Sequence, residues 1–220
     1  MEISITNTIR EACPEMALAI ISCEVRNSET SIELWSEMED EIQLFSANHV
    51  LEDIKSRPEI AATRKIYKAL GKDPNRYRPS AEALCRRIVR GIPVYKVSTL
   101  VDIINLVSIR SGFSIGGFDM DKVQGNIVLG VGSDKDVFEA IGRGLLNVEG
   151  LPLYRDETGG IGTPTSDNER TKISENTSKL LMILNGYSGK TGLQEAVNHS
   201  IGLLQKYALL REYKVDWLIP

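Results

Sequence analysis

The densest group of side chains that could do chemistry lies in a glycine-rich stretch, residues 159–171, which reads GGIGTPTSDNERT. Thr165, Ser166, Asp167, Glu169 and Arg170 could together supply hydrogen-bond donors, a base and a cation. The glycines would let backbone amides approach a ligand closely. The stretch therefore predicts a polar ligand site.

A purely structural interpretation of the same stretch stays open. Ser166 and Glu169 have the spacing of a capping box, in which two side chains satisfy the first amides of a helix. Asp167 and Asn168 suit a turn. The number of hydroxyl and charged groups nevertheless exceeds what one turn needs, and this favours the ligand site.

A second stretch, residues 97–131, contains the elements that must position this site. Ser98 is a plausible N-cap of a helix that ends near Gly112, and apolar residues cover almost all of its surface, so we expect it to be buried. Asp102 and Asn105 are polar exceptions that must find hydrogen bonds. We expect a glycine turn at 112–117, an acidic turn, and then a strand at 127–129.

The remaining pattern predicts an α/β (α+β) fold, with a mixed β-sheet core and packed helices. Further strands are expected at 2–6, 16–25, 151–154 and 180–184. Helices are expected at 31–47, 58–70, 80–90 and, at the C-terminal end, 190–212. In the first of these helices we expect Ile32, Trp35, Met38, Ile42 and Phe45 to face inward. The spacing of Thr191 and Gln194 suggests a capping box at the last helix.

Composition narrows the class of protein. With 42% hydrophobic and 25% charged residues, the chain has the composition of a soluble globular domain, which we expect to be a single compact unit over 1–220. No apolar run is long enough to cross a bilayer, and the first residues do not resemble a signal peptide. Three cysteines without a CxxC motif and only two histidines favour a reducing cytoplasm, no metal site and no cofactor.

Charge is strongly segregated along the chain. Residues 1–54 carry two basic and twelve acidic side chains, whereas residues 55–96 carry twelve basic and three acidic side chains. Several cations within reach of one another can neutralise nucleic-acid phosphates, so a basic face is expected in spite of the net charge of −4. The alternative is two ordinary helices with solvated basic faces. The candidate RNA-binding residues are Arg64, Lys68, Arg76, Arg78, Arg86, Arg87 and Arg90.

Two phosphate- or acyl-transfer motifs are incomplete. Gly186 and Gly189 are separated by two residues, whereas a Walker loop has four between its glycines. The SDN and KTG tripeptides at 166–168 and 190–192 lack the SxxK motif that supplies the nucleophile in penicillin-recognising enzymes. Neither chemistry is expected here.

Three blocks resemble the B3/4 tRNA-binding module, the editing part of the phenylalanyl-tRNA synthetase β subunit, as a free-standing protein. They are VDIIN at 101–105, FDMDKV at 118–123 followed by Gly125, and PTSDNERT at 164–171. The resemblance defines a core at about 78–187, between an α/β extension at 1–77 and the C-terminal helix. It implies tRNA and an amino-acid moiety as ligands, and no membrane partner.

The resemblance also implies an activity, the hydrolysis of wrongly attached amino acids from tRNA by a positioned water. Such a pocket would recognise the amino-acid side chain, and backbone amides would stabilise the oxyanion. The synthetase modules carry a histidine where Gly116 stands and a glutamate where this chain reads LMIL at 181–184. Asp167, Glu169 and Arg170 are therefore the candidate catalytic residues. The predicted pocket residues are Asn105, Gly116, Gly117, Phe118, Gly160, Gly162, Thr165 and Ser166.

A binding module without chemistry is the competing class. It would be either a tRNA-recognition protein or a small amino-acid sensor. A complete aminoacyl-tRNA ligase is not expected, because 220 residues leave no room for its catalytic core beside this module.

Overall fold

The apolar strands β2 (Ala17–Glu24) and β10 (Lys179–Gly186), which are largely buried on both faces, form the middle of the central sheet. A computed structural model describes residues 1–219 of the chain. The central sheet has the order β11-β2-β10-β3, and all its neighbouring strands are antiparallel. The other strands are β3 (Ile115–Asp119) and β11 (Tyr213–Leu218).

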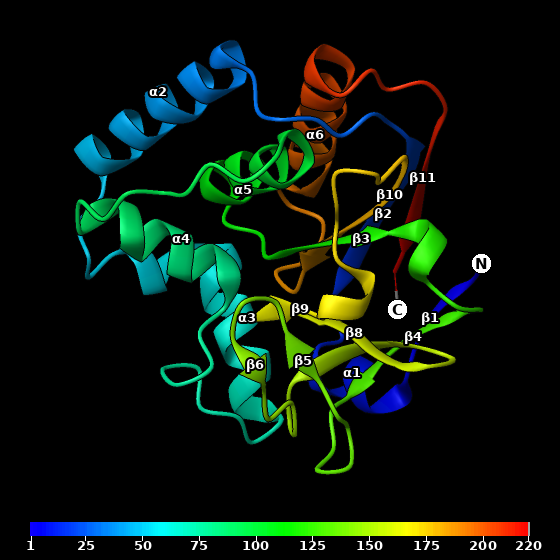
Figure 1. Cartoon of the computed structure of the whole chain (residues 1–220). Helices are drawn as coiled ribbons and strands as arrows, with labels where there is room; N and C mark the ends of the chain where they lie inside the picture. The colour runs from blue at the N-terminus through cyan, green and yellow to red at the C-terminus, as the bar shows by residue number, and fades with distance from the viewer. Residues whose placement is uncertain (220) are drawn as a thin grey trace.

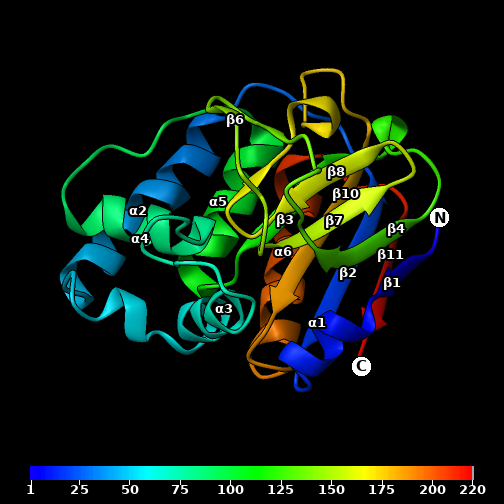
Figure 2. The same cartoon turned by 90° about the horizontal axis from the view of Figure 1, so that it is seen from below.

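A second sheet packs on one face of the first, as the view from below shows (Figure 2). Its order is β1-β4-β7-β8-β9; β1 and β4 are parallel and the other neighbours are antiparallel, so this sheet is mixed. The strands are β1 (Ile3–Ile5), β4 (Ile127–Val131), β7 (Pro152–Asp156), β8 (Gly159–Thr163) and β9 (Ser166–Asp167). A short hairpin pairs β5 (Glu139–Ala140) with β6 (Gly144–Leu145).

Helices cover the other face of the central sheet, where α2, α5 and α6 lie together in Figure 1. The α-helices are α1 (Asn7–Ala12), α2 (Ile32–Asn48), α3 (Pro58–Ala69), α4 (Ser80–Val89), α5 (Thr99–Ser111) and α6 (Leu193–Tyr207). Short 3-10 helices are η1 (Ile54–Ser56), η2 (Met120–Lys122) and η3 (Glu169–Thr171). Helices packed on one face of an antiparallel sheet, with a second, mixed sheet on its other face, give the α+β class expected from the sequence.

The alternation of side chains along β10 explains why its sequence is continuously apolar. Leu180, Met182 and Leu184 pack under the helices, whereas Leu181 and Ile183 pack between the two sheets. Successive side chains of a strand point to opposite faces, so a strand covered on both sides must be apolar at every position. The strand therefore contributes to both hydrophobic cores.

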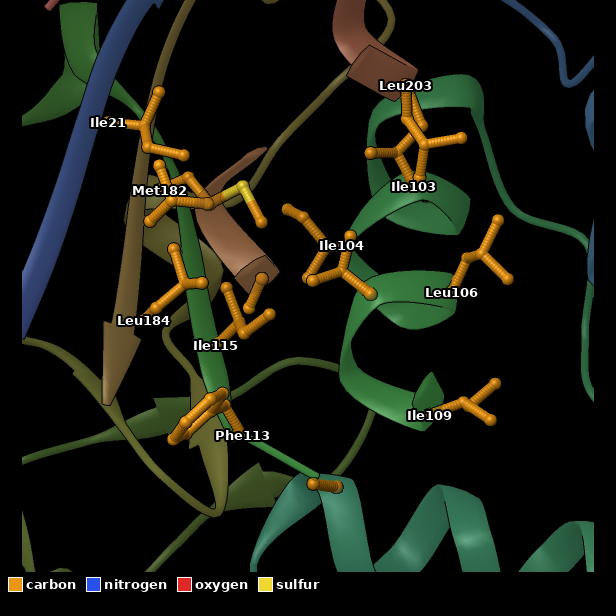
Figure 3. Close-up of a cluster of buried hydrophobic side chains, with 14 of the residues drawn as sticks. Ile21, Ile103, Ile104, Leu106, Ile109, Phe113, Ile115, Met182, Leu184 and Leu203 are labelled. Carbon is orange, nitrogen blue, oxygen red and sulfur yellow. The ribbon is translucent and has the colours of Figure 1, made fainter. Parts of the chain in front are cut away.

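Helix α5 is the most enclosed helix of the helical layer, and Figure 3 shows its side chains packed against the central sheet. Ile104 lies toward the sheet, Ile103 lies beside Leu203 of α6, and both belong to the same cluster as Met182. The buried Asp102 accepts hydrogen bonds from the Thr30 hydroxyl (2.5 Å) and from the Val97 amide (3.2 Å), so this expected polar exception is satisfied. Burial raises the pKa of Asp102.

Several local expectations differ from the structure. The second half of the predicted glycine turn, residues 115–117, belongs to strand β3, and the chain turns earlier, at the left-handed C-cap Gly112 of α5. Ile32 was expected to face inward but is 82% exposed, and Leu34 is buried in the core instead. The predicted capping box at Thr191 is wrong. The N-cap of α6 is Gly192, which has a left-handed backbone conformation, and no side chain caps the helix. The expected helix 190–212 is shorter, since α6 ends at Tyr207 and strand β11 follows.

Two glycines provide a matched test of the packing. A Cβ added at Gly132 would lie 2.0 Å from the Val148 carbonyl oxygen, a backbone atom that cannot move aside. A Cβ added at Gly202, within α6, would meet nothing within 4 Å. We expect Gly132→Ala to lower the free energy of unfolding by at least about 2 kcal/mol through overpacking. Gly202→Ala should raise it by up to about 1 kcal/mol through helix propensity.

Urea unfolding followed by circular dichroism measures both changes. Equal effects of the two substitutions would contradict the close approach of Gly132 to the segment that carries Val148.

Candidate functional site

A cavity of about 490 Å³ lies where α5 and the start of α4 face strand β3 and the β8–β9 hairpin. Ser80 and Leu84 reach it from α4, and Asn105 reaches it from α5. Gly117 of β3 and Asp167 of β9 form part of the opposite wall. The cavity thus joins the two stretches that the sequence singled out, and its volume lies within the range of small-molecule sites.

Most of the wall is apolar. Leu84, Val101, Ile104, Ile115 and Ile173 are aliphatic residues that line the cavity. They project from two helices, a strand and a loop of the packed core, so their positions are fixed by the fold. A wall of this kind favours the hydrocarbon part of a ligand, because burial of apolar surface is its main source of binding energy.

Asp167 is the acidic group of this apolar wall. Its Oδ2 accepts a hydrogen bond from the Gly117 amide at 3.1 Å. Within residues 1–219, Oδ1 accepts no hydrogen bond, and it is not among the fully enclosed polar atoms. Burial raises the pKa of Asp167 to about 7, and the Gly117 hydrogen bond only partly opposes this shift. The carboxyl group can therefore exchange a proton near neutral pH, as a general base must.

Two further polar side chains of the cavity can contact a ligand. The hydrogen-bond partner expected for Asn105 is missing: its half-buried side chain lines the cavity, and no described residue bonds to its amide, which offers both donors and an acceptor. Lys172 also lines the cavity, and its ammonium group forms an ion pair with Glu169. The pocket therefore combines a carboxyl, an amide and a cation with an apolar wall.

The hydroxyl side chains at the cavity are mainly structural. Thr165 Oγ1 lies 2.9 Å from the Tyr67 hydroxyl and donates to the Tyr77 carbonyl at 3.1 Å. Thr163 Oγ1 accepts hydrogen bonds from the amides of Thr165 and Ser166, both at 3.1 Å. These bonds shape the turn between β8 and β9 and connect it to the loop before α4. Ser166 retains a partly exposed side chain at the wall.

Asn105, Gly117, Thr165 and Ser166 line the cavity as expected from the sequence, whereas the other four predicted pocket residues do not. Phe118 is fully buried between the sheets, against the positions of Gly116 and Gly162. A Cβ on Gly162 would lie 2.6 Å from the Phe118 ring. Gly160 similarly faces Phe138 and Leu153. These glycines admit core side chains and not a ligand.

The candidate catalytic residues separate in the structure. Asp167 lines the cavity, but Glu169 and Arg170 do not. Glu169 accepts a hydrogen bond from the Gly142 amide at 3.1 Å and pairs with Lys172. Arg170 binds both carboxylate oxygens of Asp156, at 3.0 and 2.7 Å, and so ties the η3 segment to β7. Glu169 and Arg170 therefore hold the segment next to Asp167 in place and do not line the cavity.

Three of the candidate RNA-binding arginines surround a buried carboxylate that sequence reasoning missed. Glu82 of α4 is 1% exposed and lies 2.8 Å from Arg64, 3.6 Å from Arg78 and 3.9 Å from Arg86. One carboxylate faces three guanidinium groups, so the cluster keeps an excess of positive charge. Burial lowers the pKa of Arg86, as does the neighbouring Arg78.

The other candidate RNA-binding residues are more accessible. Lys68, Arg76 and Arg90 are exposed. Arg87 lies over the exposed ring of Tyr95, 4.4 Å from its centroid, and donates to the Pro93 carbonyl. Ser80 and Leu84 of the same helix line the cavity, so the cationic side of α4 borders the pocket. Within residues 1–219, the ion pairs of the acidic helix α2 run to Arg110 and Lys206 and not to the arginines of α4.

Several pocket residues were not identified from the sequence as such. Leu84 lines the cavity, and the available signal was its position at the inner edge of the amphipathic helix α4. Ile141, Ile173 and Lys172 reach the cavity from segments whose pattern gives no periodicity. Only the folded arrangement brings them to Asp167.

The raised pKa of Asp167 has a consequence for stability. Unfolded Asp167 loses its proton near pH 3.8, whereas the folded protein holds it until about pH 7. The folded protein therefore loses stability as pH rises through this interval. We expect Asp167→Asn to raise Tm more at pH 8 than at pH 5, by about 2–4 °C for each 1 kcal/mol relieved. Calorimetry at the two pH values tests this, and a pH-independent change in Tm would contradict it.

Residues 1–219 hold neither a metal-binding cluster nor a membrane-spanning helix. No cluster of three histidine, cysteine, aspartate or glutamate side chains is placed to hold a metal ion in this part of the chain. No helix in the same range has the length and apolarity needed to cross a membrane.

Comparison with known proteins places this geometry in a family. No curated protein matches the chain. Among solved structures, an N-terminal fragment of the phenylalanyl-tRNA synthetase β subunit from Pyrococcus horikoshii is similar, with 14% identity and a TM-score of 0.46. The alignment covers 97% of this chain and 50% of the fragment, so the chain spans about half the length of that structure.

The B3/4 domain matches residues 62–209, which extends past both ends of the segment 78–187 in which the sequence blocks lie. This range contains α4, α5, both glycine-rich strands and Asp167, and thus every cavity-lining residue discussed above. Because the match spans well over half of the chain, the protein belongs to the B3/4 domain family.

Proposed function

We propose that this protein binds the aminoacylated end of a tRNA and hydrolyses its aminoacyl ester. The observation that carries the proposal is a carboxyl group with a pKa near 7 in an apolar cavity, beside a helix with accessible arginines. The B3/4 family and the sequence blocks that resemble the synthetase editing module support the same assignment. A location in the cytoplasm, where three unpaired cysteines stay reduced, is part of the proposal.

The cavity would hold the amino-acid side chain of the substrate. Its aliphatic wall, from Val101 and Ile104 on one side to Ile173 on the other, suits an apolar side chain. Asn105 is available to bind the polar atoms next to the ester, namely the carbonyl oxygen or the α-amino group. The ribose and phosphates of the tRNA end would then lie outside the cavity.

Asp167 would act as the general base. The Gly117 amide holds Oδ2, so Oδ1 can accept the proton of a water molecule. The water oxygen bonds to the ester carbonyl carbon, and the bond from this carbon to the ribose oxygen then breaks. The ribose oxygen takes the proton that Asp167 had accepted, which regenerates the carboxylate, and the products are a free amino acid and an uncharged tRNA. The Gly117 amide is already engaged, so Asn105 and Lys172 are the candidates for stabilising the oxyanion.

The arginines of α4 would contact the phosphates that follow the terminal nucleoside. Arg87 and Arg90 are not used to neutralise Glu82, unlike Arg64, Arg78 and Arg86. Each guanidinium group that neutralises a phosphate releases condensed counterions, which makes binding dependent on salt. Tyr95, over which Arg87 lies, offers an aromatic surface for an unpaired base.

A non-catalytic amino-acid or tRNA binder is the second candidate. The same Oδ1 atom of Asp167 could hold the α-ammonium group of an amino acid in an ion pair without doing chemistry. In that case the ionised carboxylate would bind ligand, but no ester would be cleaved. The two functions therefore differ in turnover and not in the residues that contact the ligand.

The first test replaces Asp167 by Asn, which removes the base and keeps the shape of the side chain. For a tRNA charged with an aliphatic or aromatic amino acid, we expect the catalysed rate of ester loss to fall about 100-fold or more. Binding of uncharged tRNA should be unchanged. In the native protein, the catalysed rate should rise with pH up to about 7 and then level off, because only the ionised Asp167 accepts a proton.

Glu169→Gln is the matched control, since it removes a carboxylate outside the cavity lining. It should leave most of the activity. The absence of turnover with every charged tRNA tested, together with amino-acid binding that requires Asp167, would reject the hydrolase and favour the binder.

The second test concerns the arginines of α4. We expect the Arg87→Gln, Arg90→Gln double variant to bind tRNA more weakly at low salt. The slope of log K against log salt should fall by about 0.7 for each single-strand phosphate that the variant no longer neutralises. Lys65→Gln, an exposed lysine on α3 paired with Glu15, is the control with little expected effect. Fluorescence anisotropy over a salt series provides the slopes, and equal slopes for both variants would place the RNA elsewhere.

A further inference from the structure

Strand β11 leaves one edge of the central sheet open. It pairs with β2 on one side, and no strand or loop of residues 1–219 pairs with its other side. In Figure 1 it lies at the outer edge of the sheet. The opposite edge strand, β3, is bridged by Lys172 at Phe118, so it is not open in the same way. An open edge presents unpaired amides and carbonyls that can pair with another strand.

The direction of the free groups follows from the pairing. The Glu24 amide donates to the Glu212 carbonyl at 2.8 Å, so residue 212 directs its backbone toward β2. Backbone groups alternate along an antiparallel strand. Tyr213, Val215 and Trp217 therefore direct their amides and carbonyls away from the sheet, and no hydrogen bond within residues 1–219 engages them.

The sequence of this edge is complementary to itself. It reads Tyr-Lys-Val-Asp-Trp from 213 to 217, with Val215 at the centre. If a second copy pairs antiparallel about Val215, Lys214 stands opposite Asp216 of that copy. Tyr213 then stands opposite Trp217 on the other face. Opposite charges and aromatic pairs at directly opposed positions are the favourable cross-strand pairs.

We propose that two copies of this chain associate through their β11 edges, which pair antiparallel about Val215. The four-stranded central sheets of the two copies would join into one continuous sheet. On one face, Lys214 and Asp216 of the two copies form a closed set of four alternating charges. Within residues 1–219 these two side chains form an ion pair with each other at 2.8 Å, and they are 73% and 48% exposed.

The exposed aromatic residues favour a second copy of this chain as the partner. Tyr213 is 49% and Trp217 37% exposed, although both stand on the face that packs under α6. Pairing with an identical edge covers both rings at once. The paired segment is short, so the interface is at the small end of specific contacts, and we expect a Kd of about 10–100 μM.

Charge reversal gives a test with internal complementation. Lys214→Asp places two acidic groups opposite two others, and Asp216→Lys places basic groups opposite basic groups. Each variant alone should therefore stay monomeric at concentrations where the native protein dimerises. An equimolar mixture of the two variants restores every opposite pair and should dimerise again. Sedimentation equilibrium measures the mass of each sample, and circular dichroism verifies that both variants are folded.

Lys65→Asp is the control, because it changes charge by the same amount on an exposed side chain far from β11 in the sequence and should leave the dimer intact. A native protein that stays monomeric at about 1 mM, well above the expected Kd, would overturn the proposal. So would a mixture of the variants that fails to associate. The Asp167→Asn variant should dimerise like the native protein, so this proposal and the proposed hydrolase fail or succeed separately.

Discussion

The site depends on the close approach of helix α5 and strand β9 to a stretch of β3 that has no side chains. A Cβ on Gly117 would lie 2.4 Å from Ile104 of α5, and a Cβ on Gly116 would lie 2.8 Å from the Phe118 ring. Because these positions are glycines, the carboxyl group of Asp167 can reach the Gly117 amide. Larger residues would separate α5 from the sheet and move Asp167 away from its only backbone hydrogen-bond donor among the described residues. The glycines thus fix the distance across the cavity.

Long periodic segments were predictable from the sequence, and the glycine-rich strands were not. Helix α5 and strand β10 follow their expected bounds closely, because continuous apolar periodicity encodes burial directly. Strands β3 and β8 consist largely of glycine, which has a low strand propensity and usually marks turns. Here tertiary packing overrides propensity, since Phe118 fills the space above Gly116 and Gly162. The sequence could show that these glycines mattered, but not that they face a ring.

The same limit applies to the charged residues. Sequence spacing grouped Asp167, Glu169 and Arg170, but β9 and η3 direct them to different neighbours. Arg170 is paired with Asp156, whereas no cation pairs with Asp167 in the described part of the chain. Glu82 and Asp167 are thus carboxylates in opposite settings. Three arginines surround Glu82, which is the arrangement of a structural ion cluster. Asp167 instead lines the cavity and has one oxygen that accepts no hydrogen bond from the described residues.

The apolar wall also limits how selective the proposed hydrolase can be. A hydrophobic pocket separates side chains that differ by one methylene by only about 1–3 kcal/mol, and it rejects an added hydroxyl poorly. Strong rejection requires buried polar groups that a wrong ligand leaves unpaired, and in this cavity Asn105 and Asp167 lie where the ester and amino group would sit. Selection among amino acids would therefore follow size and shape, with side chains too large for the cavity excluded. Selection among tRNAs would have to come from contacts outside it, along the cationic side of α4.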